Sequence, residues 1–376
     1  MVYLDYASTT PIRPEVIEKM QMVLSQSFGN PSSTHSWGRK SKVLIEDARK
    51  HIAQIFNAKS QEIIFTSSAT EANNWILFNV VNNLNIKRII STRIEHHSVL
   101  DAIGRIKEQN DVEVVYLEVD KYGMPNLELL EKLLADNQAT LVSLMHVNNE
   151  IGTILDLQKV ASVCKMYKAY FHTDTVQSVG KMRIDLEETP IDFMVGSAHK
   201  FYGPKGIGFV YVRKNLHLKP IFIGGNQERG LRAGTEAVHQ IVGLQTALTL
   251  AYQQLEKDNA HNLHIKNYLL NQLELHIQGA KINGLTTQSV PNILNITLPF
   301  KKHLASMMVF SLDLKGVAVS RGSACQSGSN EPSHVLEAIL TEEEINLPSI
   351  RVSWGIFTTK DDIDKLVVAL KELSQN

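Results

Sequence analysis

Cysteine is almost absent from this sequence of 376 residues, which contains only Cys164 and Cys325. Two cysteines form no disulfide framework, and such a chain fits a reducing compartment, so we expect a cytoplasmic protein. Long apolar stretches are lacking too, because no run approaches the ~20 residues of a membrane-spanning helix. The first residues lack the basic segment and apolar stretch of a secretion signal, so none is predicted.

An excess of charge of either sign is also missing. The chain carries 38 Lys and Arg against 39 Asp and Glu, and has no basic block. Nucleic acid and anionic membrane surfaces are therefore not expected as partners. What is present is an ordinary globular composition, with 43% hydrophobic residues. This length and composition predict a sizeable core and two domains.

Short apolar segments alternate with helical patterns from residue 61 onward, which predicts a mostly parallel sheet covered by helices on both faces. In such α/β sheets, ligands bind beyond the carboxyl ends of the strands. The predicted strands are 63–65, 88–91, 112–117, 141–145, 170–172, 191–195 and 207–212, and the predicted helices are 70–81, 99–106, 127–134 and 160–167.

The two ends of the chain have a different pattern. The first 13 residues favour an extended arm, and Pro14 opens a helix. Residues 235–268 predict one or two long helices. Beyond them lies a smaller unit. We expect an arm of residues 1–15 that packs with the small domain, a large domain of 16–256 and a small α+β domain of 257–376. The small domain's predicted strands are 293–297 and 350–353, and its predicted helices are 304–312, 333–339 and 361–373.

Lys200 lies in a segment of small residues, Gly196–Gly208, between two apolar strands. Burial of a lysine lowers its pKa and frees the amine as a nucleophile. Ser197 and His199 supply donors for a phosphate beside it. This combination suits a Schiff base with pyridoxal phosphate. The alternative is an exposed lysine in a hairpin loop.

Polar residues at the predicted strand ends extend this interpretation. Asp174 follows strand 170–172 and would keep a pyridine nitrogen protonated, while Gln177 would bond the ring hydroxyl. Asn149 follows strand 141–145 and could bond a phenolate oxygen. The alternatives are a helix N-cap for Asp174 and a turn for Asn149.

Two predicted helix starts carry hydroxyl groups. Ala69 and Thr70 follow strand 63–65, where free backbone N–H groups would bind a phosphate. Thr235 stands near another helix start and is a second candidate phosphate contact. The alternative at residues 67–71 is an ordinary Ser/Thr cap.

Three further side chains are candidates for chemistry. His96 could stack on a ring or move a proton, and the adjacent His97 is not taken as a metal ligand because supporting ligand spacing is lacking. Arg351 could hold a substrate carboxylate with its fork, unless it forms only a surface ion pair. Cys325 lies among glycines and serines, which favours a reactive thiol over an accidental surface one. Cys164 lies in a predicted helix and is expected in the core.

Four motifs occur together, in one order, across nearly the whole chain. They resemble the cysteine desulfurases of the class V aminotransferase-like group, and the long loop of about 321–332 resembles the subgroup that serves iron–sulfur cluster assembly. Ser68 departs from the family's usual glycine, and Arg321 and Gln326 differ from its usual small or hydroxyl residues. The motifs are Tyr3–Thr10, His146–Gly152, His199–Gly206 and Gly322–Cys325.

The resemblance implies a fold-type I pyridoxal phosphate enzyme that removes sulfur from L-cysteine, giving L-alanine and a persulfide on Cys325. Lys200 would be the Schiff-base lysine, and Cys325 a transient iron–sulfur ligand as well. It further implies a homodimer, in which Thr235 reaches the partner's phosphate, and an iron–sulfur scaffold or another sulfur acceptor as partner. Asn149 and Arg351 would bind substrate. The remaining cofactor-binding residues would be Ala69, Thr70, His96, Asn149, Asp174, Gln177, Ser197 and His199.

Three alternatives stay open. A selenocysteine lyase or a class V aminotransferase would share the fold, and formation of alanine with a persulfide excludes the aminotransferase. The relative rates on cysteine and selenocysteine distinguish a cysteine desulfurase from a selenocysteine lyase. A non-catalytic binding protein is the third alternative, and such a protein would stay colourless with the cofactor.

Overall fold

Seven strands form the central sheet of the protein, whose computed structural model describes residues 1–322 and 333–375. The strand order is β2-β8-β7-β6-β5-β3-β4, and only β8 runs antiparallel to its neighbours. This confirms the predicted mostly parallel sheet. The strands are β2 Ile63–Thr66, β3 Arg88–Thr92, β4 Glu113–Leu117, β5 Thr140–Ser143, β6 Tyr170–Asp174, β7 Phe193–Ser197 and β8 Gly208–Val212.

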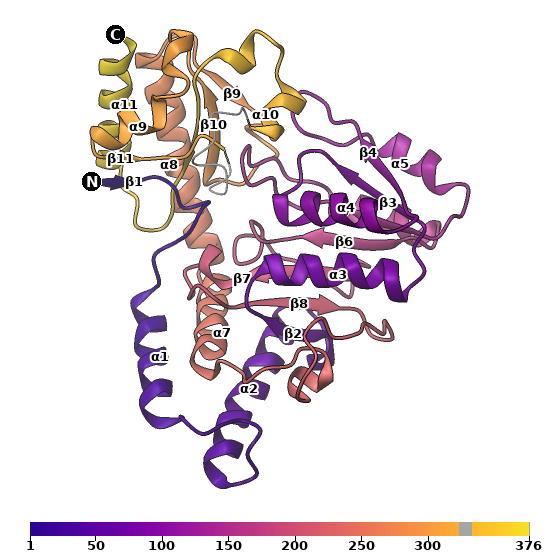
Figure 1. The fold of residues 1–376 in the computed structure, drawn as a ribbon. Helices are drawn as coiled ribbons and strands as arrows, with labels where there is room; N and C mark the ends of the chain where they lie inside the picture. Colours follow the sequence, from indigo (N-terminus) through magenta and orange to yellow (C-terminus); the bar gives the residue numbers. More distant parts are fainter. Residues whose placement is uncertain (323–332, 376) are drawn as a thin grey trace.

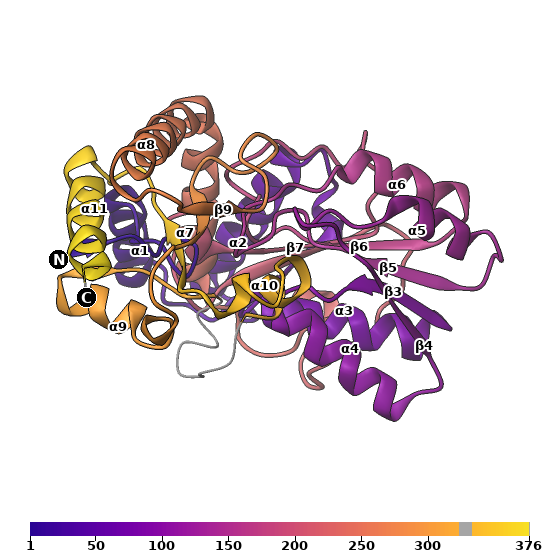
Figure 2. The same cartoon turned by 90° about the horizontal axis from the view of Figure 1, so that it is seen from above.

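Helices cover both faces of this sheet, as Figure 2 shows. On one face lie α3 (Ala69–Asn83) and α4 (His97–Gln109), whose apolar residues share a core with β3, β7 and β8. On the other face lie α5 (Leu127–Leu134) and α6 (Leu157–Met166). The second face also packs against α1 (Pro14–Gln26), α2 (Ser36–Ile55) and α7. The near-continuous apolar strands are therefore explained by burial on both sides.

The one or two long helices predicted over residues 235–268 are two, α7 (Val238–Gln253) and α8 (Leu255–His276), joined at Gln254. Helix α8 leads into a separate core built on an antiparallel sheet, β12-β10-β9, with α11 (Lys360–Ser374). Figure 1 shows this unit and both chain termini at one end of the molecule. We propose that it is the small domain of residues 257–376. Its strands are β9 Lys281–Asn283, β10 Ile293–Thr297 and β12 Ser349–Ser353.

Two predicted helices of the small unit differ from the observed ones. The helix expected over residues 304–312 is a 3-10 turn, Lys302–Leu304, followed by α9, Met308–Leu314. The reason is burial, since Met308 and Leu312 enter the core four residues apart whereas Leu304 is only partly buried. The helix expected over 333–339 begins one residue later, as α10 (His334–Ile339), because Ser333 caps it.

The N-terminal arm connects the two units. Strand β1 (Val2–Tyr3) pairs in parallel with β11 (Val317–Ala318) of the small unit. The arm then crosses to the segment that carries Lys200, where the backbone N–H of Thr10 donates to the His199 carbonyl at 2.9 Å. The Thr10 hydroxyl also accepts from the backbone N–H of Tyr202 at 2.8 Å. The arm therefore forms one wall of the space around Lys200.

Candidate active site

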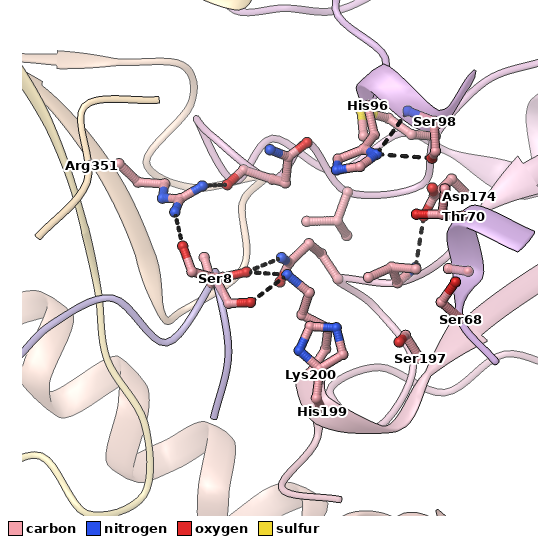
Figure 3. Close-up of a pocket in the computed structure, with 17 residues that line it drawn as sticks. Ser8, Ser68, Thr70, His96, Ser98, Asp174, Ser197, His199, Lys200 and Arg351 are labelled. Atoms are coloured by element: carbon pink, nitrogen blue, oxygen red, sulfur yellow. Dashed lines mark hydrogen bonds between the residues drawn. The ribbon is translucent and has the colours of Figure 1, made fainter. Parts of the chain in front are cut away.

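A cavity of about 220 Å³ lies at the carboxyl ends of the parallel strands, bounded also by the arm and the small unit (Figure 3). We call it the central cavity. Two predicted site residues are not among those that line it: Thr235, and Cys325, which lies outside the described residues. The predicted residues that line the central cavity are Ala69, Thr70, His96, Asn149, Asp174, Gln177, Ser197, His199, Lys200 and Arg351.

Lys200 ends a 3-10 turn, Ala198–Lys200, that directly follows β7. Its Nζ atom donates to the carbonyl oxygens of Ala7 at 2.6 Å and Ser8 at 2.9 Å. In Figure 3 the amine lies between Arg351 on one side and Asp174 and Thr70 on the other. The amine is therefore presented inside the cavity, which excludes the alternative of an exposed hairpin lysine.

Asp174 is the last residue of β6 rather than a residue beyond the strand, and it is 5% exposed. Its Oδ1 atom accepts from the backbone N–H of Val176 at 3.0 Å, and its Oδ2 atom accepts from the Asn73 amide at 2.9 Å. Both partners are donors, and donors stabilise the ionised carboxylate. The predicted alternative of a helix N-cap does not apply, because α6 ends before this strand and a further strand, β7, is the next regular element.

A buried chain of hydrogen bonds orients Asn73. Because its amide nitrogen donates to Asp174, its Oδ1 atom accepts from His172 Nε2 at 3.1 Å. His172 Nδ1 then accepts from the Ser143 hydroxyl at 2.8 Å. Burial lowers the pKa of His172 to about 4, so the imidazole is neutral and has one donor and one acceptor nitrogen. In this series of hydrogen bonds, each group therefore donates in the direction of Asp174.

His96 is the N-cap of α4, and its ring lines the central cavity. The Nδ1 atom accepts from the backbone N–H of Ser98 at 3.1 Å, so the neutral ring carries its proton on Nε2. Burial lowers the pKa of His96, and the charge of Lys200 lowers it further, while the Asp174 carboxylate opposes them. A neutral planar ring with one N–H can stack on a flat ligand and move a proton.

The phosphate candidates lie at the start of α3. Ser68 caps this 15-residue helix, since its hydroxyl accepts from the backbone N–H of Glu71 at 3.2 Å. A Cβ atom at Gly208 would lie 3.1 Å from the Ser68 carbonyl carbon, so only glycine lets β8 pass this close. The cap and an anion site coexist here, because a capped helix start still presents other backbone N–H groups and a positive dipole end. Ser197, the last residue of β7, faces the same end of the cavity (Figure 3).

Arg351 is the third residue of β12, and it is 1% exposed. Its guanidinium donates to the Asp5 carboxylate at 2.9 Å, the Ser8 hydroxyl at 2.7 Å and the Asn149 carbonyl at 3.0 Å. Its Nε atom has no hydrogen-bond partner among the described residues. The default of a surface ion pair is therefore wrong, because the arginine is a buried cation that lines the cavity.

Thr235 is exposed and lies three residues before α7, so it does not begin that helix. It lines a separate cavity together with Ser67 and Arg232. The loop that carries it is held by a buried ion pair, in which Arg49 contacts both oxygens of Glu228 at 2.7 Å. Thr235 of this chain is thus not brought to the central cavity, and its predicted role depends on a second subunit.

Cys164 is 1% exposed, as expected for a core residue, and burial raises its thiol pKa far above the ordinary value. A thiol in that environment is unreactive at neutral pH. Within residues 1–322 and 333–375 there is no cluster of three or more His, Cys, Asp and Glu that could hold a metal. The described helices likewise include none that is both long and apolar enough to cross a membrane.

The sequence interpretation missed part of the cavity wall. Ala7 and Ser8 act through backbone carbonyls, which no side-chain pattern reveals. Asn73 and His172 act through Asp174, and a signal for them exists. His172 stands two residues before Asp174 in one strand and so shares its face, and Asn73 is a polar residue on the apolar face of a predicted helix.

The chemical groups that line the central cavity fit pyridoxal phosphate. The central cavity joins an amine, a buried carboxylate, a helix start with hydroxyl groups and a planar imidazole. These groups match an aldehyde, a pyridine nitrogen, a phosphate and a ring face, respectively.

Glu95, next to His96, gives a pH-dependent prediction. Its Oε1 atom accepts from Met145 N–H and the Thr92 hydroxyl at 3.0 Å, and burial raises its pKa to about 8. An unfolded Glu has a pKa of about 4.3. Between the unfolded and the folded pKa, the folded chain binds more protons than the unfolded chain. The free energy of unfolding therefore falls by about 1.4 kcal/mol for each unit of rising pH.

We expect Glu95→Gln, which is always neutral, to remove this loss. Urea unfolding from pH 6 to pH 8 should show the variant gaining stability relative to the wild type as pH rises. Parallel stability curves for the two proteins would show that Glu95 is ionised in the fold.

Comparisons with known proteins agree with this geometry. The model of the family described as aminotransferase class-V matches residues 2–366. A cysteine desulfurase IscS of Dictyoglomus turgidum is 42% identical over 374 residues, covering 99% of this chain and 94% of that protein. The cysteine desulfurase IscS of Pseudoalteromonas translucida is 40% identical and covers 98% of this chain and 92% of its own.

Solved structures give the same result. A NifS-like protein superposes with a TM-score of 0.89 at 34% identity, covering 99% of this chain and 98% of its own. The NifS-like protein from Rickettsia africae has a TM-score of 0.88 at 33% identity, with both chains covered in full. A structure described as SspA in complex with cysteine has a TM-score of 0.82 at 32% identity and covers 96% of this chain and all of its own. The family predicted from the motifs is therefore confirmed, and this chain belongs to the aminotransferase class-V family.

Proposed function

We propose that the protein is a cysteine desulfurase that uses pyridoxal phosphate and passes sulfur from L-cysteine to an acceptor protein. The observation that carries the proposal is the amine of Lys200 inside a cavity that also holds Asp174 and the start of α3. The names of the full-length relatives, both cysteine desulfurases, support the choice of substrate.

The cofactor would be held at three places. Lys200 would bind its aldehyde carbon, Asp174 its pyridine nitrogen, and the start of α3 with Ser197 and His199 its phosphate. Burial lowers the pKa of His199 to about 4, and a phosphate beside the ring would raise it again because a negative charge stabilises the imidazolium. When bound, pyridoxal phosphate supplies an electron-withdrawing ring that weakens bonds around the substrate's α-carbon.

The chain's own residues would act on the substrate in turn. Arg351 would bind the carboxylate, and Lys200 would take the α-proton. The Cys325 thiolate would attack the substrate sulfur, so that a sulfur–sulfur bond forms as the carbon–sulfur bond breaks. The carbon fragment keeps that electron pair and gains a proton, which leaves L-alanine and a persulfide on Cys325. Cys325 could then present its sulfur to an acceptor or ligate a transferred iron–sulfur cluster.

A homodimer is the proposed assembly. Thr235 is exposed away from the central cavity. The loop after α1 and the start of α2 expose large apolar side chains, Phe28 at 72% and Trp37 at 51%. These rings stack on each other, with centroids 4.9 Å apart. Exposed apolar patches of this kind mark protein–protein contacts. A second copy over this surface would bring Thr235 to its partner's phosphate. Sedimentation of the purified protein would test the dimer.

The decisive experiment incubates the protein, loaded with pyridoxal phosphate, with L-cysteine. We expect stoichiometric alanine and, by mass spectrometry, one added sulfur atom on the peptide that contains Cys325. Transfer of an amino group to a keto acid without sulfur on the thiol would instead indicate an aminotransferase. A much higher rate on selenocysteine than on cysteine would indicate a selenocysteine lyase. A protein that stays colourless with the cofactor would have a binding role only.

Arg351→Lys should raise KM for L-cysteine by about 10- to 100-fold with a smaller change in kcat, because an ammonium cannot hold a carboxylate with two donors in a fixed fork. Arg88→Lys is the matched control, since Arg88 is also buried but pairs with Glu113 and Asp136. Steady-state kinetics would check this. An unchanged KM in the Arg351 variant would contradict the assigned carboxylate contact.

A further inference from the structure

Lys181 is a largely buried cation without a carboxylate partner among the described residues. Its Nζ atom donates to Gln177 Oε1 at 2.8 Å. Burial, together with the nearby charges of Lys200 and Arg351, lowers the pKa of Lys181 to about 7. A positive charge near Lys200 and Arg351 is electrostatically unfavourable. No ion pair among the described residues compensates for this repulsion at Lys181. Its contact with Gln177 is the feature that requires an explanation.

That contact fixes which way the Gln177 amide faces. The ammonium of a charged lysine donates hydrogen bonds and cannot accept one, so the amide oxygen faces Lys181 in that form. The amide nitrogen then faces the opposite way, where it donates to the Ala7 carbonyl at 2.9 Å. The same carbonyl accepts from Lys200 Nζ at 2.6 Å. Gln177 thus presents N–H groups, not an oxygen, on the side of the central cavity that holds Lys200.

We propose that Lys181 is a positioning residue that locks Gln177 as a hydrogen-bond donor toward the ring oxygen of the cofactor. Lys181 is not among the residues that line the central cavity, so it acts through Gln177. This inference rests on the proposed function, because it requires pyridoxal phosphate at Lys200. Without Lys181 only the Ala7 carbonyl favours this orientation. The amide would then turn more readily, and a turned oxygen would repel the ring oxygen.

The consequence is a measurable pH effect. The yellow form of the lysine-bound cofactor would carry a proton on the nitrogen that joins it to Lys200. That proton would form a hydrogen bond to the ring oxygen. A second donor on that oxygen draws charge from it and stabilises the deprotonated form, which lowers the pH midpoint at which the yellow colour is lost. Loss of the donor should raise this midpoint by about one pH unit, which corresponds to one hydrogen bond to a charged group.

The test is a spectroscopic pH titration of the loaded protein, together with the dissociation constant of pyridoxal phosphate. Lys181→Met should raise the midpoint by about one unit and weaken cofactor binding by about 10-fold. Lys181→Arg, which also only donates, should keep the wild-type midpoint. Lys266→Met is the matched control. Lys266 is a second buried lysine, which bonds Ser289 at 2.7 Å and does not line the cavity.

A double-mutant cycle separates positioning from charge. On a Gln177→Leu background, Lys181→Met should cause no further shift, whereas a shift that persists in full means that Lys181 acts by its charge and overturns the proposal. Lys181→Gln, which presents either an oxygen or a nitrogen, gives the same test if the methionine variant does not fold. If the wild type and the variants are all yellow and lose the colour at the same pH midpoint, the role of Lys181 is overturned but the proposed function is not. A wild type that never turns yellow overturns the proposed function itself.

Discussion

Lys200→Ala should remove covalently bound cofactor and lower kcat/KM for L-cysteine by about 10³-fold or more. The amine is the proposed nucleophile for the cofactor's aldehyde and the proposed base for the α-proton, so one substitution removes two roles. Its Nζ atom is also held by the Ala7 and Ser8 carbonyls at 2.6 and 2.9 Å, in a geometry that an alanine cannot reproduce. Absorbance of the purified variant and its turnover would check both effects.

The control is Lys205→Ala in the same loop. Lys205 is exposed and does not line the central cavity, so its loss should leave the yellow colour and the turnover unchanged. We expect the Lys200 variant to bind added pyridoxal phosphate only reversibly, through Asp174 and α3, with lower affinity and a shifted absorbance band. An unchanged yellow band in Lys200→Ala would mean that another amine holds the cofactor.

The central sheet was predictable because its sequence pattern is simple. Strands buried on both faces must be apolar throughout, and the segments 63–65, 88–91 and 170–172 stand out between helical periodicities for that reason. Their carboxyl ends then place Asp174 and the α3 start on one edge without further information. Errors of one or two residues remain at strand ends, because Asp174 and Ser197 are polar residues that continue the hydrogen-bond ladder.

The remaining part of the site was not predictable, because it depends on backbone groups and on contacts between distant segments. Ala7 lies 193 residues from Lys200 and contacts it through a carbonyl, which every residue has. The partners of Arg351 come from the arm and from Asn149, so its burial could not be inferred from strand β12 alone. Orientation of an amide such as Gln177 also needs a structure, since the residue type does not tell which end faces the cavity.

Cys325→Ser should abolish persulfide formation and lower alanine production on the order of 10⁴-fold, while the yellow colour of the lysine-bound cofactor stays. A serine hydroxyl is not ionised at neutral pH and is a poor nucleophile toward sulfur. The substitution leaves unchanged every residue that is proposed to hold the cofactor in the central cavity. Cys325→Ser should therefore keep the yellow colour and lose turnover, whereas Lys200→Ala should lose both.

The second cysteine supplies the matched control. Burial in α6 raises the pKa of the Cys164 thiol, so Cys164→Ala should keep both the colour and the turnover. Sulfur attached to Cys164, or full alanine turnover by Cys325→Ser in the presence of a reductant, would contradict the proposed division of roles. A protein in which only Cys325 is needed for turnover, and only Lys200 for colour, would support a mechanism in which the ring weakens the carbon–sulfur bond and a separate thiol removes the sulfur.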